Sequence, residues 1–466
     1  MATLIEKILR RNTGNKEAKP GDIVTANVDR VMVHDIFIPF VAEKFEEMGF
    51  QKIWDPDKMV LVYDHMVPAS QVDDTRHFRK GDEFAAKYGV KNVHRTDGIC
   101  HQLMAEKYVQ PGDVVFGTDS HTVTYGALGA FSTGIGYTEM AGILGTGQLW
   151  LRVPETIRVN IEGKLPEGVT SKDVILTVIG DITASGATYQ SLEFAGTTVQ
   201  NMSVASRLTM SNMTVEAGAK CGLCYPNMET LHFTEAHPMS SGIFGDDYKD
   251  AFKEIFETVL ASEASAESED AAADADASEH RPGTAGFLHT ATGSRCYESS
   301  PEGTEFARVL NYRAEDFKPV MACPSQVDAV RPVSEEKGIS VDQVFIGSCT
   351  NGRLEDLHAA AAVLKGKKVA PFVKLIVTPA SRDIYREALA DGTLEALSEA
   401  GAMITTPGCG LCCGRAGGIL SDNEVVVATN NRNFLGRMGT SKVQIYLASP
   451  VTAANCALAG KIVVSD

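Results

Sequence analysis

The sequence has little that would tie it to a membrane, to nucleic acid or to an oxidising compartment. No apolar run is long enough to cross a bilayer, and the N-terminus lacks the apolar core of a signal peptide. Positive charge is scarce, because 43 lysines and arginines stand against 60 acidic residues and leave a net charge of −17. Such a surface repels the phosphates of nucleic acid and of anionic lipid. We therefore expect no nucleic-acid partner, no membrane partner and a cytoplasmic location, in which the ten cysteines would stay reduced.

One stretch also lacks large apolar side chains. Residues Ala261–Glu279 consist of alanine, serine, glutamate and aspartate. A segment of this composition cannot offset the entropy that it loses on ordering by burying apolar surface. We expect a disordered or loosely helical acidic insertion near residues 261–280, on the surface of the protein.

The first third of the chain alternates between short apolar runs, typical of buried strands, and helical patterns. The expected strands are Ile23–Val28, Met59–Tyr63 and Val114–Phe116, and the expected helices are Phe40–Met48, Thr75–Tyr88 and Ile99–Lys107. Alternation of this kind predicts an α/β fold with a largely parallel sheet covered by helices. Ligands of such sheets bind beyond the carboxyl ends of the strands.

The length of 466 residues allows two to three domains. Changes of pattern along the chain predict α/β domains at residues 1–155, 156–325 and 326–466. In the second we expect a helix over Met213–Lys220, opening near Asn212. In the third we expect strands at Val344–Ile346, Val373–Val377 and Val425–Ala428.

Three cysteines lie in glycine-rich turns of the last third. Cys349 and Cys409 each follow an apolar run that predicts a strand, and Cys412 comes shortly after. Thiolates on strand-end loops suit a soft metal ion or an iron–sulfur cluster. A structural zinc site and thiols buried in a core remain alternatives.

Three further cysteines have a less certain meaning. Cys413 follows Cys412 directly and is either a small inert side chain or an alternative ligand. Cys221 and Cys224 have the spacing of half a metal site, but no partner pair lies at a sensible distance along the chain. We favour a structural role for that pair.

The order of motifs around the three cysteines carries a family resemblance. The spacing C-x59-C-x2-C, with Gly-Ser-Cys-Thr-Asn at its start and Asn-Arg-Asn-Phe-Leu-Gly-Arg after it, resembles the aconitase superfamily. Within it, the chain is most similar to the large subunits of two-subunit isopropylmalate dehydratases and homoaconitases, from about Ile5 to about Gly460. The resemblance fades across Pro238–Arg295, which supports an insertion there.

The resemblance implies three α/β domains around a central [4Fe–4S] cluster. Cys349, Cys409 and Cys412 would bind three of its irons and leave one iron without a cysteine ligand. Such an iron can act as a Lewis acid on a substrate hydroxyl and carboxylate. Two asparagines, Asn212 and Asn351, would orient the cluster or its ligands.

The resemblance also implies pairs of histidine and carboxylate for the acid–base steps of a dehydration. The pairs match Asp64 with His65, Asp119 with His101, and Glu216 with His121. A carboxylate beside an imidazole raises the pKa of the ring, so that the ring can deliver a proton at neutral pH. The expected substrate-binding residues are His34, Ser120, Asn431, Arg432 and Arg437, since arginine forks bind carboxylates bidentately.

The chain stops at Asp466, without the fourth, swivelling domain of single-chain aconitases. We expect a separate small subunit to carry that domain. The resemblance therefore implies that the chain is the large subunit of a hydro-lyase that dehydrates or isomerises a 2-hydroxy di- or tricarboxylate. The substrate that we expect first is 3-isopropylmalate, of leucine biosynthesis. Homoaconitate, 2-methylmalate and 2,3-dimethylmalate are close alternatives. An iron sensor and an electron carrier that uses Cys413 as a fourth thiolate are alternatives of another class.

Overall fold

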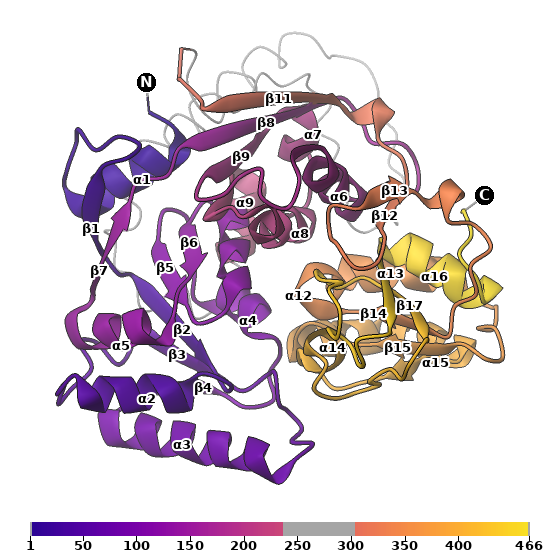
Figure 1. The fold of residues 1–466 in the computed structure, drawn as a ribbon, viewed down its shortest axis with the longest axis horizontal. Helices are drawn as coiled ribbons and strands as arrows, with labels where there is room; N and C mark the ends of the chain where they lie inside the picture. The colour runs from indigo at the N-terminus through magenta and orange to yellow at the C-terminus, as the bar shows by residue number, and fades with distance from the viewer. Residues whose placement is uncertain (1, 236–302, 465–466) are drawn as a thin grey trace, which may run out of the picture.

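The computed structural model describes residues 2–235 and 303–464. The acidic run near 261–280 and the whole stretch Pro238–Arg295 lie outside the described residues. Figure 1 shows three groups of elements: an indigo-to-purple group, a magenta group that β11 joins, and an orange-to-yellow group. Each group is built on a sheet with helices against it, which confirms the expected α/β fold class.

The first sheet has five parallel strands in the order β4-β3-β2-β5-β6. Its strands are Asn92–His94 (β4), Met59–Val62 (β3), Arg30–His34 (β2), Val114–Gly117 (β5) and Phe131–Gly134 (β6). The helices of this part are Leu4–Thr13 (α1), Ile38–Glu47 (α2), Val72–Tyr88 (α3), Cys100–Lys107 (α4) and Tyr137–Thr146 (α5). Every residue of β2, β3 and β5 is buried, because helices cover a parallel sheet on both faces.

The strand expected at Ile23–Val28 exists but lies outside this parallel sheet. It spans Ile23–Asn27 (β1) and pairs antiparallel with Gln148–Arg152 (β7). Its alternating burial, exposed then buried along the strand, is the pattern of a two-stranded ribbon with one face toward solvent.

The second sheet has four parallel strands in the order β10-β9-β8-β11. Its strands are Cys221–Cys224 (β10), Ser191–Ala195 (β9), Thr156–Glu162 (β8) and Arg308–Arg313 (β11). The helices here are Ser171–Ile182 (α6), Thr197–Gln200 (α7), Val204–Asn212 (α8) and Met228–Glu235 (α9).

The helix expected over Met213–Lys220 was wrong. The chain forms α8 before this segment, over Val204–Asn212, and continues only as a short 3₁₀ turn over Met213–Ala217 (η2). Gly218 then takes a left-handed conformation with φ 84° and ends the turn. The residues of α8 are rich in serine and threonine, so their helix propensity is low, and burial in the tertiary structure outweighs that propensity.

The third sheet has seven strands in the order β13-β12-β18-β17-β14-β15-β16. They are Val330–Pro332 (β13), Val320–Ala322 (β12), Gln444–Leu447 (β18), Val425–Ala428 (β17), Gln343–Ile346 (β14), Lys374–Val377 (β15) and Met403–Ile404 (β16). The helices are Ser348–Asn351 (α12), Leu354–Leu364 (α13), Arg382–Ala390 (α14), Thr393–Ala400 (α15) and Pro450–Ala459 (α16). The strands from β18 to β16 are parallel, while β12 and β13 are antiparallel.

Short 3₁₀ turns complete the described chain. Besides η2 they are Ser120–Leu128 (η1), Ala314–Asp316 (η3), Val333–Glu335 (η4) and Gly410–Cys413 (η5). The division into domains near residues 155 and 325 stays a prediction. Within the described ranges, no helix is both long and apolar enough to pass through a bilayer.

Cys221 and Cys224 serve as core residues. Both are fully buried in β10, and an offset of three along a strand turns their side chains to opposite faces. Cys221 accordingly packs in the core of the first group, while Cys224 packs in the core that the second and third sheets share. The two thiols cannot converge on one ion from opposite faces of a sheet.

This arrangement predicts that neither thiol matters for metal content. Cys221→Ala or Cys224→Ala is expected to lower the free energy of unfolding by about 0.5–3 kcal/mol, because each opens a small cavity in a packed core. Iron per chain after anaerobic reconstitution should equal that of the unaltered protein, whereas Cys349→Ala, the matched control, should lose iron. Urea unfolding and iron analysis check this, and iron loss in either core variant would contradict the structural role.

Candidate active site

The carboxyl ends of two sheets carry the residues that the sequence singles out. In the first sheet, β2 ends at His34. Its two neighbours are β3, which ends just before Asp64, and β5, which ends just before Asp119. In the third sheet, β14 and β17 are neighbours and are followed by Cys349 and Asn431. The backbone N–H of Cys409 donates to the carbonyl oxygen of Asp64 at 2.8 Å, so the two edges meet directly. Parallel strands end on the same edge, and this geometry collects residues that are far apart in the sequence.

Asp64 and His65 form a buried pair after β3. His65 Nδ1 lies 2.7 Å from Asp64 Oδ1, and the second oxygen of Asp64 accepts from the backbone N–H of Cys100 at 2.7 Å. Burial by itself would lower the pKa of His65, but the carboxylates of Asp64 and Asp119 outweigh it and raise that pKa well above the usual value. The pair therefore carries a protonated imidazole at neutral pH.

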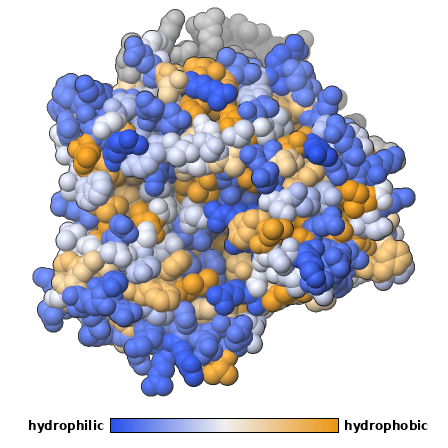
Figure 2. Space-filling view, in the orientation of Figure 1, coloured by the Kyte–Doolittle hydropathy of each residue, from blue (hydrophilic) through white to orange (hydrophobic). Residues whose placement is uncertain are grey.

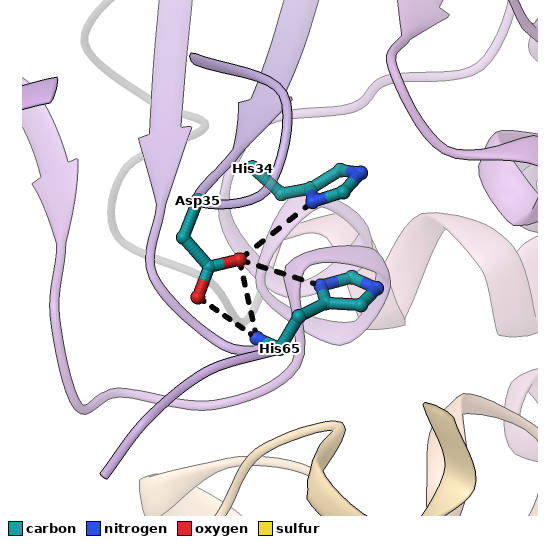
Figure 3. A group of neighbouring side chains, drawn as sticks. All are labelled: His34, Asp35 and His65. Atoms are coloured by element: carbon teal, nitrogen blue, oxygen red, sulfur yellow. Dashed lines mark hydrogen bonds and ion pairs between the residues drawn. The ribbon is translucent and has the colours of Figure 1, made fainter. Parts of the chain in front are cut away.

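Asp35 is a site residue that the sequence interpretation missed. Its carboxylate accepts from the backbone N–H groups of His65, at 3.1 and 3.3 Å, and of Met66, at 2.8 Å. Figure 3 shows this carboxylate pointing toward both imidazoles, with one oxygen 3.6 Å from His34 Nδ1 and 3.7 Å from His65 Nδ1. Its place directly after His34, at a strand end, was the signal that could have identified it.

His34 stacks on His65, and its ring makes no hydrogen bond with the described residues, although its Nδ1 lies 3.6 Å from Asp35 Oδ1. The two ring centroids are 4.2 Å apart with an interplanar angle of 24°, and Phe37 meets the His34 ring edge-on. His34 is 1% exposed, and neither ring nitrogen makes a hydrogen bond. Buried polar groups are normally satisfied, so these two nitrogens suit a ligand hydroxyl or carboxylate.

Asp119 joins three histidines at the end of β5. Its Oδ1 lies 2.9 Å from His101 Nε2 and 3.3 Å from His121 Nδ1, and its Oδ2 lies 3.7 Å from His65 Nε2. Burial would raise the pKa of Asp119, but these histidines hold it well below the usual value. Burial lowers the pKa of His101 despite Asp119, so His101 stays neutral beside a protonated His65. When the pKa values of neighbouring groups are shifted in opposite directions, one group can act as proton donor and the other as proton acceptor.

Glu216 connects this network to the arginines. Its Oε1 lies 2.9 Å from His121 Nε2, and Arg432 Nε donates to the same oxygen at 2.8 Å. Burial would raise the pKa of Glu216, but His121 and Arg432 lower it, so the carboxylate is ionised. Arg437 follows in the same turn as Arg432, and its buried Nε has no hydrogen-bond partner among the described residues, which leaves that donor available to a substrate carboxylate.

Hydrogen-bond donors surround the sulfur atoms of the candidate metal ligands. Asn212 and Asn431 direct their side-chain amides at Cys349 Sγ, at 3.2 and 3.4 Å. Ser348 Oγ lies 3.7 Å from Cys349 Sγ and 3.5 Å from Cys412 Sγ, and Arg437 Nη2 lies 3.7 Å from Cys412 Sγ. Donors around thiolate sulfurs are the usual surroundings of an iron–sulfur cluster. Ser348 was missed by the sequence interpretation, although it directly precedes Cys349.

The three cysteines are not gathered around a single ion. Four-coordinate zinc with Zn–S bonds of about 2.3 Å would hold its sulfurs about 3.8 Å apart. In the described chain, the groups of three whose ligand atoms all lie within 4.8 Å of one another are histidine and carboxylate sets, one of them with Cys100, and the three cysteines are not such a group. All three thiols are buried, and hydrogen-bond donors lie at the sulfurs of Cys349 and Cys412. Buried thiols with donors at their sulfurs are a donor set that suits a [4Fe–4S] group.

Two turns must pack closely to place Arg437 near Cys412. Gly414 ends η5 with φ 69°, and a Cβ at this position would lie 2.6 Å from the carbonyl oxygen of Arg437. Only glycine allows this approach without displacing the arginine turn.

The remaining predicted residues take less direct positions. Cys413 directs its thiol at the carbonyl oxygens of Gly410, at 3.2 Å, and His65, at 3.6 Å. Asn351 donates to Asp356 at 2.9 Å, and Ser120 opens η1 directly after Asp119. Asn431, for which substrate binding stays a prediction, directs its amide at Cys349 Sγ and at the side-chain oxygen of Asn212. Figure 2 shows a hollow near the middle of this face, where hydrophilic residues gather between the first and third groups.

Comparison with known proteins agrees with this geometry. Residues 6–460 match the model of the aconitase family (aconitate hydratase). The "3-isopropylmalate dehydratase large subunit 1" of Methanopyrus kandleri is 45% identical over 99% of this chain and 98% of its own length. A "Probable methanogen homoaconitase large subunit" of Methanothermobacter thermautotrophicus is 40% identical over 98% of this chain and 96% of its own length.

A third relative, the "3-isopropylmalate dehydratase large subunit" of Elusimicrobium minutum, is 41% identical over 99% of this chain and 97% of its own length. The family match covers nearly the whole sequence, including the turns that carry the cysteines and the histidine–carboxylate pairs. Because both the pattern and its extent agree, the chain is a hydro-lyase that belongs to the aconitase family.

Proposed function

We propose that this chain is the large subunit of a [4Fe–4S]-dependent dehydratase that acts on 3-isopropylmalate. Membership in the aconitase family implies the [4Fe–4S] cluster. The single observation that carries the proposal is the meeting of two edges, one with buried histidine–carboxylate pairs and one with three buried cysteines, two of which have hydrogen-bond donors at their sulfurs. The choice of 3-isopropylmalate as substrate is based on the names of the relatives.

The residues of the first edge divide the proton transfers of a dehydration. His65, held protonated by Asp64 and Asp119, donates a proton to the departing hydroxyl. Asp119 also keeps His101 and His121 in fixed orientations through its Oδ1. Glu216 is ionised and shared between His121 and Arg432, so it suits accepting a hydrogen bond from the bound hydroxyl or water.

The polar groups without partners bind the substrate. Arg437 offers its buried Nε to a carboxylate, and His34 offers two ring nitrogens. Phe37 meets the His34 ring edge-on and Phe40 lies next to Phe37, so the two phenylalanines bring apolar surface to that end of the site. An isopropyl group gains free energy from such surface, whereas an additional carboxylate does not. The apolar neighbours therefore favour isopropylmalate over homoaconitate.

Cys349, Cys409 and Cys412 would hold the cluster and leave one iron without a cysteine ligand. When bound, that iron would supply Lewis-acid binding of the substrate hydroxyl and one carboxylate. Cys413 stays outside the ligand set, because its thiol faces two backbone carbonyls.

A separate small subunit completes the enzyme in this proposal. It would carry the swivelling domain, with the base that removes the carbon-bound proton and a loop that selects the substrate side chain. The designation of the relatives as large subunits supports a partner. The cytoplasmic location stays a prediction, consistent with the nine free cysteines of the described chain.

Homoaconitate remains a second candidate substrate, because one relative bears the name of a homoaconitase large subunit. The deciding experiment combines the chain with the small subunit from the same genome. We expect rapid formation of the unsaturated acid from 3-isopropylmalate, followed by ultraviolet absorbance, and slow turnover of homoaconitate and the two methylated malates. Faster turnover of homoaconitate would overturn the substrate assignment but leave the hydro-lyase chemistry in place.

The open iron site makes a spectroscopic prediction. Protein reconstituted under anaerobic conditions should give a three-iron electron paramagnetic resonance signal after mild oxidation, and ferrous ion should abolish it. Cys413→Ser should behave in the same way, because Cys413 is no ligand. A cluster that resists iron loss, and does so only while Cys413 is present, would support an electron carrier with four thiolates.

The charge on His65 makes a prediction about pH. A raised pKa keeps His65 protonated to higher pH than a free imidazole, so activity falls as pH rises through that pKa. Asp64→Asn removes the adjacent negative charge, and the alkaline limb of kcat should move to lower pH by about one to three units.

The kcat of Asp64→Asn at its optimal pH should also fall by about 10²-fold or more, because the His65 proton donor is less well oriented. The pH profile of the complex with its small subunit measures both effects. The matched control is Asp73→Asn, since Asp73 forms a surface pair with Arg76 in which both side chains are 74% exposed. An unchanged alkaline limb in Asp64→Asn would rule out the acid role of His65.

A further inference from the structure

Lys172 is a fully buried lysine in a position that opposes its charge. It is 0% exposed and lies in the first turn of α6, where the helix dipole disfavours a cation. Burial lowers its pKa to about 7. An ion pair with a carboxylate is the usual way to stabilise a buried cation. Among the described residues, no carboxylate lies within ion-pair distance of the Lys172 ammonium group, whose partners are backbone carbonyls. Because burial and the helix dipole both disfavour the charge of Lys172, we expect another group to stabilise it.

The ammonium group reaches from the second sheet's helix to the turn after β17. Lys172 Nζ donates to the carbonyl oxygens of Thr429, at 2.9 Å, and Asn430, at 2.6 Å. The carbonyl oxygen of Thr429 also accepts from Thr350 Oγ1 at 2.6 Å. Lys172 thus ties α6 to the turn after β17, and Thr350 joins the same turn to α12, which contains Cys349.

The residues that follow this turn are parts of the site. Asn431 donates to Cys349 Sγ, and Arg432 pairs with Glu216. The groups whose negative charge raises the pKa of Lys172 are, in order of effect, Cys412, Asp356, Cys349 and Asp173. Asp173 turns its carboxylate away, to the N–H groups of Thr170 and Val320, and Asp356 accepts from Asn351 and Arg353. Cys412 has Arg437 at its sulfur, and Lys172 is a second, fully buried cation that acts on the cysteines.

We propose that Lys172 is a positioning residue for the cluster, which supplies the buried positive charge behind its thiolates and holds the turn that carries Asn431 and Arg432. This inference rests on the proposed function, because it needs a cluster on Cys349, Cys409 and Cys412. Charge and hydrogen bonds around the sulfurs tune both the retention of iron and the potential of such a cluster.

The test compares Lys172→Met with Lys172→Arg in the full-length chain. Methionine keeps the length and apolar stem but removes the charge, while arginine keeps the charge. After anaerobic reconstitution, Lys172→Met should lose its labile iron on mild oxidation about 10- to 100-fold faster than the unaltered protein, and its reduction potential should shift. Lys172→Arg should retain iron better than Lys172→Met.

A structural role would move a different quantity, the stability of the cluster-free chain. Removing a buried charge relieves its desolvation cost but takes the donor from the carbonyl oxygens of Thr429 and Asn430, and because the two effects oppose each other we expect the thermal midpoint of cluster-free Lys172→Met to change little. Lys220→Met is the matched control: burial also lowers the pKa of Lys220, but this lysine is only partly buried and its ammonium lies over the Tyr189 ring. Iron retention in that variant should equal that of the unaltered chain.

Three results would overturn the inference. The first is Lys172→Met with unaltered iron retention and potential. The second is a loss of iron that merely parallels a lower midpoint of the cluster-free chain. The third is an unaltered chain that forms no cluster with a labile iron, which overturns the proposed function as well, whereas the first two leave it standing.

Discussion

The site depends on the contact between the carboxyl ends of two parallel sheets. The first sheet brings carboxylates and imidazoles to its edge, and the third brings thiols and arginines to the opposing edge. The hydrogen bond from the Cys409 N–H to the carbonyl oxygen of Asp64 joins the edges at the point where the two kinds of chemistry meet. Because a strand end leaves its following residues free of the ladder, each edge can present side chains without weakening its sheet.

Burial then decides how the charged groups behave. Isolated carboxylates and cations would be expensive to bury, so nearly every one at this site shares a hydrogen bond with a group of opposite charge or with an imidazole. Asp64 holds His65, Asp119 holds three histidines, and Glu216 lies between His121 and Arg432. The groups left without a protein partner, the ring nitrogens of His34 and the Nε of Arg437, are the ones that a substrate can satisfy.

The second sheet contributes to the site mainly through its helices. Asn212 ends α8 beside Cys349, and Lys172 begins α6 and reaches the turn after β17. These residues connect three parts of the chain around the cysteines. Replacement of either one is therefore expected to act on the metal centre and less on the cores of the individual sheets.

The sequence by itself determined the α/β class, the family, the cysteine set and the histidine–carboxylate pairs. Local pattern sufficed for these, because β3, β14 and β17 are continuous apolar runs and the motifs after them are short and contiguous. It misplaced the helix near Asn212, since burial of a serine- and threonine-rich segment outweighs local propensity. Asp35, Ser348 and Lys172 emerged only from the tertiary structure, because their roles come from contacts with residues distant in the sequence or from backbone groups, and neither leaves a pattern in the sequence. Which nitrogen or oxygen remains without a partner is likewise decided only when the two edges meet, since hydrogen bonding there is a property of the packed site.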